Sequence, residues 1–370
     1  MAIAKNQHFV PRFYLRNFSF RQDNKSVSVW VIDSNKFIKR ASISNQACRE
    51  YFYGQDLVVE NAFHEIETFI ASVIKSAIID HILPPRGSEL HSTIVAFIIS
   101  LSLRTKFQAE MINESSDKLF KTIYRNHPDV RGKEDSFFIA SRDAPRLALQ
   151  VLEASIALSL DLNCQLLLNN TSKAFITSDN PVIKHNQLFI RDKETSHLGF
   201  ASSGLQILLP LNPRVCLLFF DQNVYRVGNR QDSLLHISDT TSIDIINEFQ
   251  YINADKALYF DETVEPNYIR VLSEKVHEYR RKSKAVVNEY DVAPEQPNTS
   301  RSIIHVRSSL ISKNLDIRGV RILKKAKSKL SDETIELYRN KRLANMVYEQ
   351  YEEQAKSRQQ RRSSIHNIES

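Results

Sequence analysis

Apolar residues recur at helical spacing in two long segments of the first third of the chain. In VVENAFHEIETFIASVIKSAII, residues 58–79, they return every three or four positions, which predicts an amphipathic helix. SELHSTIVAFIISLSLRTKF, which begins at Ser88, is apolar nearly all round and predicts a central, buried helix. Asp143 followed by Ala-Pro is a good helix start, and it predicts a third helix that runs to about Leu160.

Alternation of apolar and polar residues predicts strands elsewhere. SVSVWVIDSNKFIKRASI alternates from residue 26 and breaks at residues 33–35, which is typical of a hairpin. QLLLNNTSKAFITSDNPVI predicts two strands that turn at residues 169–170, and LQILLPLNPRVCLLFF predicts two more that join at residues 211–213. TTSIDIINEFQYINADKALYF predicts a helix followed by a short strand. The fold class is therefore α+β, with three or more helices packed against an antiparallel or mixed sheet.

The remaining segments are expected to be less regular. Residues 113–136 are charged and predict an irregular surface excursion, while Pro294, Pro297 and Ser300 mark a linker. Ser331-Asp332-Glu333 predicts the start of a long charged helix. We expect three parts: an α+β body over residues 1–285, a linker and irregular segment over 286–330, and a charged, basic C-terminal helix or tail over 331–370.

Charge is unevenly distributed along the 370 residues, whose net charge is +7. From Val271 to the end there are 21 Lys and Arg against 13 Asp and Glu, so the preceding residues sum to about −1. A basic C-terminal third favours an anionic partner, RNA, DNA or an acidic surface, although a tail charged for solubility explains the same excess. The candidate nucleic-acid contacts are Arg280, Arg281, Lys282, Lys284, Lys324 and Lys325.

Several compartments and enzyme classes are disfavoured. The three cysteines, Cys48, Cys164 and Cys216, are far apart and form no CxxC pair, which argues for a reducing compartment. The chain start has no apolar signal run, and the longest apolar run is too short for a membrane helix, so we expect a cytoplasmic protein without membrane contact. The glycine loops of P-loop and dinucleotide-binding enzymes, GxSxG and HExxH are all absent from the sequence.

The opening segment NQHFVPRFYLRNFSF carries three possible cations at four-residue spacing, His8, Arg12 and Arg16. Pro11 suits a first helical turn, so a short helix from Pro11 to about Phe18 would place both arginines on one side. Two arginines can hold a phosphate, and a histidine can move a proton near neutral pH. The cations would instead be merely solvated if the stripe lies on an open surface.

Arg104 ends the apolar run of the second helix and is expected to be partly buried, where a guanidinium needs a carboxylate or an anionic ligand. The simplest partner is Glu67, in an internal pair that holds two helices in register. Glu60, His64 and Glu67 lie on one helix face and could alternatively ligate a divalent metal, although such spacings are common by chance. Otherwise the sequence indicates no cofactor.

Asp179 and Asn180 follow an apolar strand in TSDNPV. An Asp-Asn pair at a strand end commonly makes an Asx turn, which Pro181 fits. The alternative places both side chains at the rim of a pocket.

These segments together resemble a known family. QHFVPRFYLRNFS, the helix with Glu60 and Glu67, Arg104, ITSDNPV, and LLPLNPR are similar, in this order, to the domain-of-unknown-function family numbered 4238. The resemblance spans about residues 6–260, and its motif residues are matched by His8, Arg12, Arg16, Asp179 and Asn180. It implies no agreed activity, and the basic tail lies outside it.

Three functions fit this sequence. The first is a metal-independent phosphodiesterase or nuclease, such as an RNase of toxin or defence type, with an Arg/His anion pocket. The second is a non-catalytic module that binds a nucleotide or phosphate, and the third is a scaffold with an internal salt-bridge network. The candidate catalytic residues are His8, Arg12, Arg16, Glu67, Arg104, Asp179 and Asn180.

Overall fold

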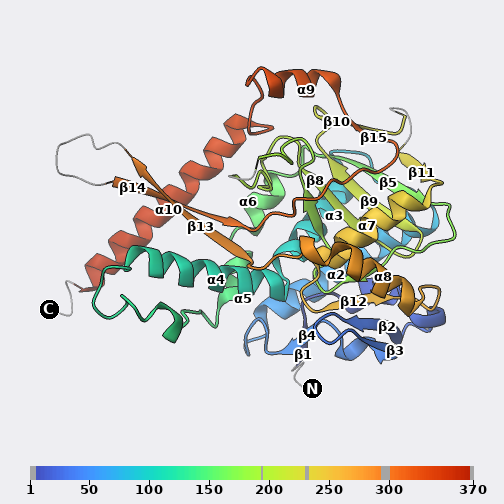
Figure 1. The fold of residues 1–370 in the computed structure, drawn as a ribbon, viewed down its shortest axis with the longest axis horizontal. Coiled ribbons are helices and arrows are strands. Elements are labelled where there is room, and N and C mark those ends of the chain that lie inside the picture. The colour runs from blue at the N-terminus through green and yellow to red at the C-terminus, as the bar shows by residue number, and fades with distance from the viewer. Residues whose placement is uncertain (1–5, 193–194, 230–232, 293–300, 367–370) are drawn as a thin grey trace.

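Strands β2 (Ser26–Val31) and β3 (Lys36–Ser42) form the predicted hairpin and belong to a four-stranded antiparallel sheet (Figure 1). The strand order is β3-β2-β12-β6, with β12 at Ala257–Phe260 and β6 at Thr177–Ser178. The computed structural model describes residues 6–192, 195–229, 233–292 and 301–366.

A second sheet has five strands in the order β11-β5-β9-β8-β7, and β11 runs parallel to β5 while the other pairs are antiparallel. The predicted hairpin across residues 211–213 is confirmed, because β8 pairs with β9. The predicted hairpin at residues 169–170 is wrong, since β5 and β6 belong to different sheets. The strands are β5 (Asn163–Asn169), β7 (Ile183–His185), β8 (Gln206–Pro210), β9 (Val215–Phe220) and β11 (Leu234–Ile237).

Both faces of the five-stranded sheet are buried, which explains why its central strands are continuously apolar rather than alternating. Leu217 of β9 faces a core formed with helices α2 (Val58–Ile79) and α3 (Glu89–Leu103). Its neighbour Leu218 faces a second core formed with α7 (Thr240–Asn253) and α8 (Pro266–Val276). The α+β class is therefore confirmed, with a mixed sheet between helical layers.

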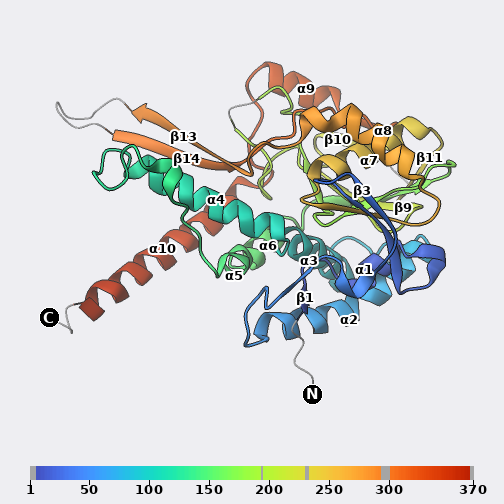
Figure 2. The ribbon, with the colours of Figure 1, turned by 60° about the horizontal axis from the view of Figure 1, so that its bottom comes forward.

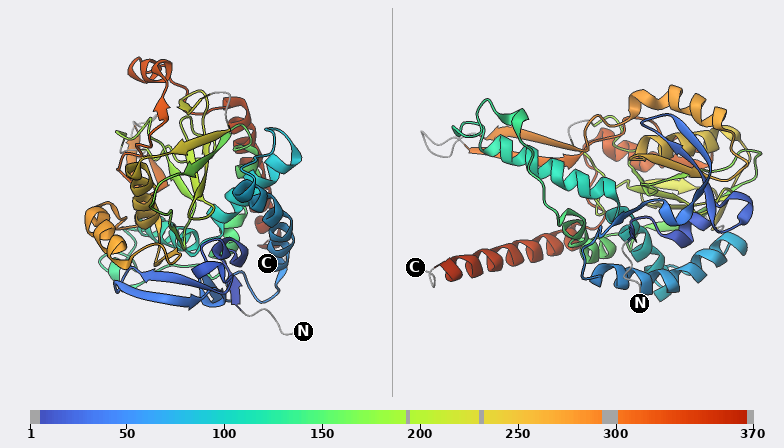
Figure 3. Two further views of the ribbon diagram at one scale, coloured as in Figure 1. Left: turned by 90° about the vertical axis from the view of Figure 1, so that its right-hand side faces the viewer. Right: turned by 90° about the horizontal axis from the view of Figure 1, so that it is seen from below.

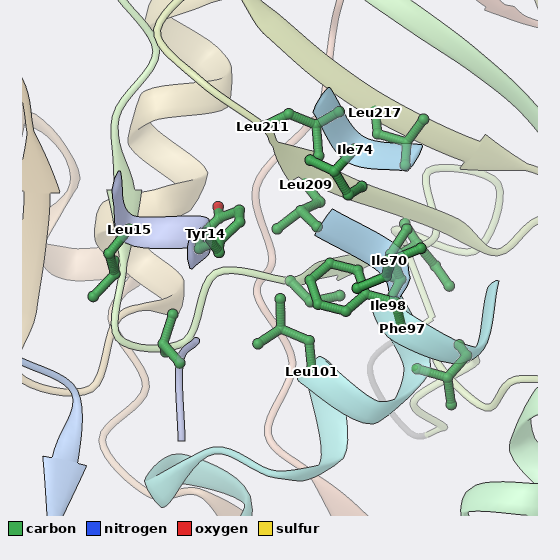
Figure 4. Close-up of a cluster of buried hydrophobic side chains, with 14 of the residues drawn as sticks. Tyr14, Leu15, Ile70, Ile74, Phe97, Ile98, Leu101, Leu209, Leu211 and Leu217 are labelled. Carbon is green, nitrogen blue, oxygen red and sulfur yellow. The ribbon is translucent and has the colours of Figure 1, made fainter. Parts of the chain in front are cut away.

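Helix α3 is central, as its apolar sequence predicts, and nearly every side chain from Ile94 to Leu103 is buried. Figure 4 shows Phe97, Ile98 and Leu101 of this helix meeting side chains from α2, from strands β8 and β9, and from α1 (Arg12–Arg16). The core thus joins the start of the chain to residues about two hundred positions later. The third predicted helix is present as two short ones, α5 (Ala144–Leu149) and α6 (Leu152–Ala157).

The prediction of an irregular surface excursion over residues 113–136 is wrong for the first half of this segment. Helix α4 (Lys106–Ile123) begins directly after α3, and the Thr105 hydroxyl caps it by accepting from the Gln108 amide at 3.3 Å. Intrahelical pairs such as Lys118–Glu114 and Lys121–Asp117 support its polar sequence. A charged segment with few apolar residues can therefore be a regular helix when ion pairs between successive turns stabilise it.

The segment expected to be a linker and irregular contains regular structure. Strands β13 (Ala285–Val292) and β14 (Arg301–Ser308) form an antiparallel hairpin beside α4, followed by β15 (Val320–Ile322) and α9 (Lys324–Ser331). Pro294, Pro297 and Ser300 lie outside the described residues. The predicted helix start at Ser331 is also wrong, because Ser331 ends α9 and the long helix α10 spans Lys341–His366. The predicted domain boundaries stay a prediction.

Helix α10 leaves the body on the same side as α4 and the β13–β14 hairpin, and the two projections diverge (Figures 2 and 3). The body end of α10 is fixed by Arg339, whose side chain is 3% exposed. This guanidinium pairs with Asp161 at 2.9 Å and donates to the carbonyl oxygens of Leu158, Phe200 and Ser202. No helix in the described ranges is long and apolar enough to cross a membrane.

Candidate functional site

Arg104 lies at the C-terminal end of α3, and its side chain is 2% exposed. Its guanidinium donates to the carbonyl oxygens of His8 at 3.0 Å and Phe9 at 3.2 Å, and it pairs with Glu67 of α2 at 2.7 Å. The group also lies over the Phe63 ring, 4.2 Å from its centroid. The internal Glu67–Arg104 pair predicted from the sequence is therefore present, and it ties α2 and α3 to the opening strand.

His8 ends the short strand β1 (Asn6–His8), which pairs with β4 (Cys48–Glu50). Its Nε2 lies 3.1 Å from the carbonyl oxygen of Ser44. Burial, with a smaller contribution from the charge of Arg12, lowers the pKa of His8 to about 4. His8 is thus neutral at pH 7, whereas Arg12 and Arg16 on α1 point to solvent.

Asp179 and Asn180 are buried and bound to a different part of the molecule. The Asp179 carboxylate accepts the backbone amides of Asp255 at 2.8 Å, Lys256 at 2.7 Å and Ala257 at 3.2 Å. Burial and the nearby Asp255 charge raise the pKa of Asp179 to about 7. The Asn180 amide donates to the carbonyl oxygen of Asn253 at 2.9 Å. Both side chains serve as backbone partners where α7 leads into β12.

The seven predicted catalytic residues therefore form two groups with separate partners. His8, Glu67 and Arg104 make one group, with Arg12 near it; Asp179 and Asn180 make the other; Arg16 is exposed. The groups touch through the α3–α4 junction, because Thr105 donates to Asn180 Oδ1 at 3.2 Å. Their polar atoms are largely occupied by each other and by the backbone rather than turned toward one shared hollow.

The residues predicted to contact nucleic acid also form two groups, those bound within the protein and those that are exposed. Arg280 donates to the carbonyl oxygens of Tyr251 and Asp255, and Lys284 pairs with Asp255 at 2.8 Å, so these charges are used internally. Lys282 is exposed. Lys324 and Lys325 are exposed on α9, and they form no ion pair with any described residue.

A cavity of about 260 Å³ opens beside β7, between the loop that follows this strand and the segment after β14. We call it the Lys184 cavity. Six of its lining side chains are apolar, and the polar ones include Lys184, His185, Asn186 and Arg307. Its acid, Asp192, lies 2.7 Å from His197. This site was not predicted from the sequence, although the lysine within the buried run NPVIKH was a signal that could have indicated it.

Lys184 shares its cavity with Asp192 but forms no ion pair with a described residue, and its ammonium lies over the Phe200 ring, 4.5 Å from the centroid. Burial and the neighbouring Arg281 charge lower the pKa of Lys184 to about 8. Arg281 is itself desolvated, which lowers its pKa to about 10. Its hydrogen-bond acceptors are neutral, the carbonyl oxygen of Ser309 at 3.0 Å and Asn253 Oδ1 at 3.3 Å. Arg281 lines another cavity, which it shares with the acids Asp33, Glu114 and Asp255, whereas Lys184 forms no ion pair with a described residue.

In the part of the chain that the structure describes, no three His, Cys, Asp or Glu side chains gather in a way that could hold a metal ion. Glu60, His64 and Glu67 are therefore not placed as a ligand set.

Comparison with known proteins identifies a family. Residues 6–263, well over half of the chain, match the family model described as Protein of unknown function (DUF4238). No curated protein and no solved structure matches the chain.

Proposed function

Since the chain belongs to the DUF4238 family of proteins of unknown function, we propose its function from the chemistry of its cavities: it is a binding module for a phosphorylated ligand. The phosphate group would enter the Lys184 cavity and neutralise Lys184. This is the non-catalytic alternative named from the sequence, at a different location.

One observation carries the proposal, namely that Lys184 lines the cavity as a desolvated cation whose described partner is the neutral Phe200 ring. A buried charge without a partner lowers the stability of a protein, and such groups are usually neutralised or paired. An incoming anion would supply the missing counter-charge. Lysine and arginine are the side chains that most often bind phosphate, as a point charge and as a planar fork.

The remaining lining restricts the ligand. His185 is 3% exposed, and burial lowers its pKa to about 4, so it is neutral at pH 7 and adds a hydrogen-bonding group without charge. Asn186 is buried, and its Oδ1 has no partner within the described chain, while its amide nitrogen donates to the carbonyl oxygens of His197 and Ser203. A cavity of about 260 Å³ with apolar walls suits a phosphate group attached to a small apolar or ring-shaped part.

The test compares phosphate binding and the free energy of unfolding in two variants. We expect Lys184→Met to abolish the thermal stabilisation by inorganic phosphate and nucleoside monophosphates, yet to raise the free energy of unfolding by about 2 kcal/mol, because a desolvated charge is removed. Lys75→Met, which removes an exposed lysine of α2, should change neither quantity. Binding by the wild type should weaken as the pH rises through about 8, where Lys184 loses its proton. Unchanged phosphate binding by Lys184→Met would refute the proposal.

A second candidate is the metal-independent phosphodiesterase. The observation that favours it is the neutral state of His8 beside the exposed Arg12, because a neutral imidazole can accept a proton while an arginine stabilises developing charge. Turnover of a fluorogenic ribo-oligonucleotide should then fall at least a hundredfold in His8→Ala without loss of folded protein. Equal turnover by His8→Ala would remove this candidate.

A further inference from the structure

Two further cavities, of about 410 and 430 Å³, adjoin each other and share Gln222, Asn223 and Leu323. They lie between the turn that joins β9 to β10 (Tyr225–Val227) and the segment that carries α9. Figure 1 shows α9 standing off the body above this turn, next to β10 and β15. We call the joined cavities the α9 groove, and we propose that it binds a single strand of nucleic acid.

One end of the α9 groove is cationic because of α9 itself. This helix has the sequence KKAKSKLS, and Ala326 packs inward at 3% exposure, so the lysines around it project outward. Lys325 and Lys329 line the groove. Neither lysine forms an ion pair with a described residue, so their charges are available to an external anion.

The other end is cationic because of Arg226, which lines it next to a second arginine on the paired strand. Arg226 of β10 and Arg321 of β15 lie directly opposite each other in the antiparallel register. Like charges in directly opposite positions destabilise a strand pair unless an anion lies between or beside them. Arg226 lines the groove, and its Nε is buried without a partner among the described residues. A phosphate at this end would relieve the repulsion and satisfy that donor.

Uncharged hydrogen-bonding groups fill the space between the two cationic ends. Asn163, Gln222 and Asn223 line the groove, and their carboxamides form no hydrogen bond within the described chain. Carboxamides pair with base edges through a donor and an acceptor held side by side. Tyr338, at the α9 end, is 47% exposed and offers a ring on which a base can stack.

This arrangement of cationic ends and central carboxamides favours a single strand of nucleic acid over other anions. Cations at two separated ends match a polyanion with phosphates at intervals rather than one small phosphate. The carboxamides need base edges that are turned outward, which a single strand presents and a duplex keeps within its own grooves. Of the two acids in the lining, Glu336 is exposed, and Asp221 is occupied by the amides of Gly204 and Asn223, both at 2.9 Å.

The test measures the association constant K of the full chain for a fluorescein-labelled single-stranded oligouridine, U12, by fluorescence anisotropy at several salt concentrations. The slope of log K against log salt concentration should fall in magnitude by about 1.4 in Lys325→Ala/Lys329→Ala, since each phosphate contact to a single strand contributes about 0.7. The matched control, Lys36→Ala/Lys75→Ala, removes two exposed lysines far from the groove and should leave the slope unchanged. Gln222→Ala/Asn223→Ala should weaken binding about tenfold with an unchanged slope, because it removes contacts to bases rather than to phosphates.

Three results would overturn the proposal: a slope that does not change in the groove variant, an equal change in the control, or equally tight binding of a duplex of the same length. The proposal is independent of the Lys184 cavity. Lys184→Met should therefore bind U12 like the wild type, so that failure of either proposal can be recognised separately.

Discussion

Replacement of Arg104 by alanine tests whether the polar residues of the opening segment hold the fold together. The change removes the 2.7 Å ion pair with Glu67, the hydrogen bonds to the carbonyl oxygens of His8 and Phe9, and the contact with the Phe63 ring. Removal of one partner from a buried pair costs about 3–5 kcal/mol, chiefly because the other charge is left behind. Glu67 is 22% exposed and can be partly hydrated, so we expect a loss near the lower limit, about 3 kcal/mol.

Urea unfolding followed by the fluorescence of Trp30, the one tryptophan in the sequence, measures this loss directly. Trp30 is buried at 5% exposure in β2, and its emission should change when the body unfolds. Glu67→Gln should cost less than Arg104→Ala, and the double variant should show a coupling of about 1–3 kcal/mol between the two positions. A loss below about 1 kcal/mol in Arg104→Ala, or a coupling near zero, would refute the view that this pair is structural.

Two further predictions concern other polar contacts. Burial lowers the pKa of His185 to about 4, below the value of about 6.5 in an unfolded chain, so the unfolded state gains its proton first. The contribution of His185 to the free energy of unfolding should therefore fall by up to about 3 kcal/mol as the pH drops from 6.5 to 4. Urea unfolding of the wild type and of His185→Gln at each pH measures this contribution as the difference between the two proteins, because the other groups titrate alike in both. Arg339→Ala should detach the start of α10 from the body, because it removes the ion pair with Asp161 and the hydrogen bonds to three carbonyl oxygens. Chymotryptic cleavage near Tyr338 should then become faster, while the fluorescence of Trp30 still reports a folded body. An unchanged cleavage rate would contradict this role of Arg339.

Strong apolar periodicity was sufficient to predict several elements. Helices α2 and α3, the β2–β3 hairpin and the β8–β9 hairpin lie where the pattern of side chains indicates, since their burial is uniform along one face or on both. The Glu67–Arg104 pair could be predicted because each residue lies beside an apolar stripe, where a lone charge is costly.

Elements stabilised by distant partners could not be predicted in this way. The part of helix α4 that was expected to be irregular, from Asn113 on, has few apolar residues. Its Lys118 is bound to Ser283 and to the carbonyl oxygen of Ala285, more than 160 positions away. β6 has two residues and pairs with a strand about eighty positions later. The Lys184 cavity was missed for the same reason, because its walls come from residues near 190 and near 310.

The residues that carry the family resemblance explain the fold better than they explain an activity. The Tyr14 hydroxyl of the opening motif lies 2.7 Å from Thr177 Oγ1 in TSDNPV and donates to the carbonyl oxygen of Pro210 in LLPLNPR at 2.6 Å. At the α3–α4 junction, Arg104 donates to the carbonyl oxygen of His8 in the opening strand and Thr105 donates to Asn180. The next residue, Lys106, pairs with Asp255. These segments are far apart in sequence, so their polar groups must be satisfied by one another once they are buried.

Both proposed binding sites, in contrast, are completed by residues beyond position 263, where the family match ends. The Lys184 cavity needs the chain around Ser309, and the α9 groove needs Lys325, Lys329 and Tyr338. The matched region supplies the rigid inner wall of each site, and the basic C-terminal region supplies the outer wall and part of the positive charge. The choice of anionic ligand should therefore depend on the C-terminal region, whereas the buried polar contacts of the matched region should decide whether the body folds.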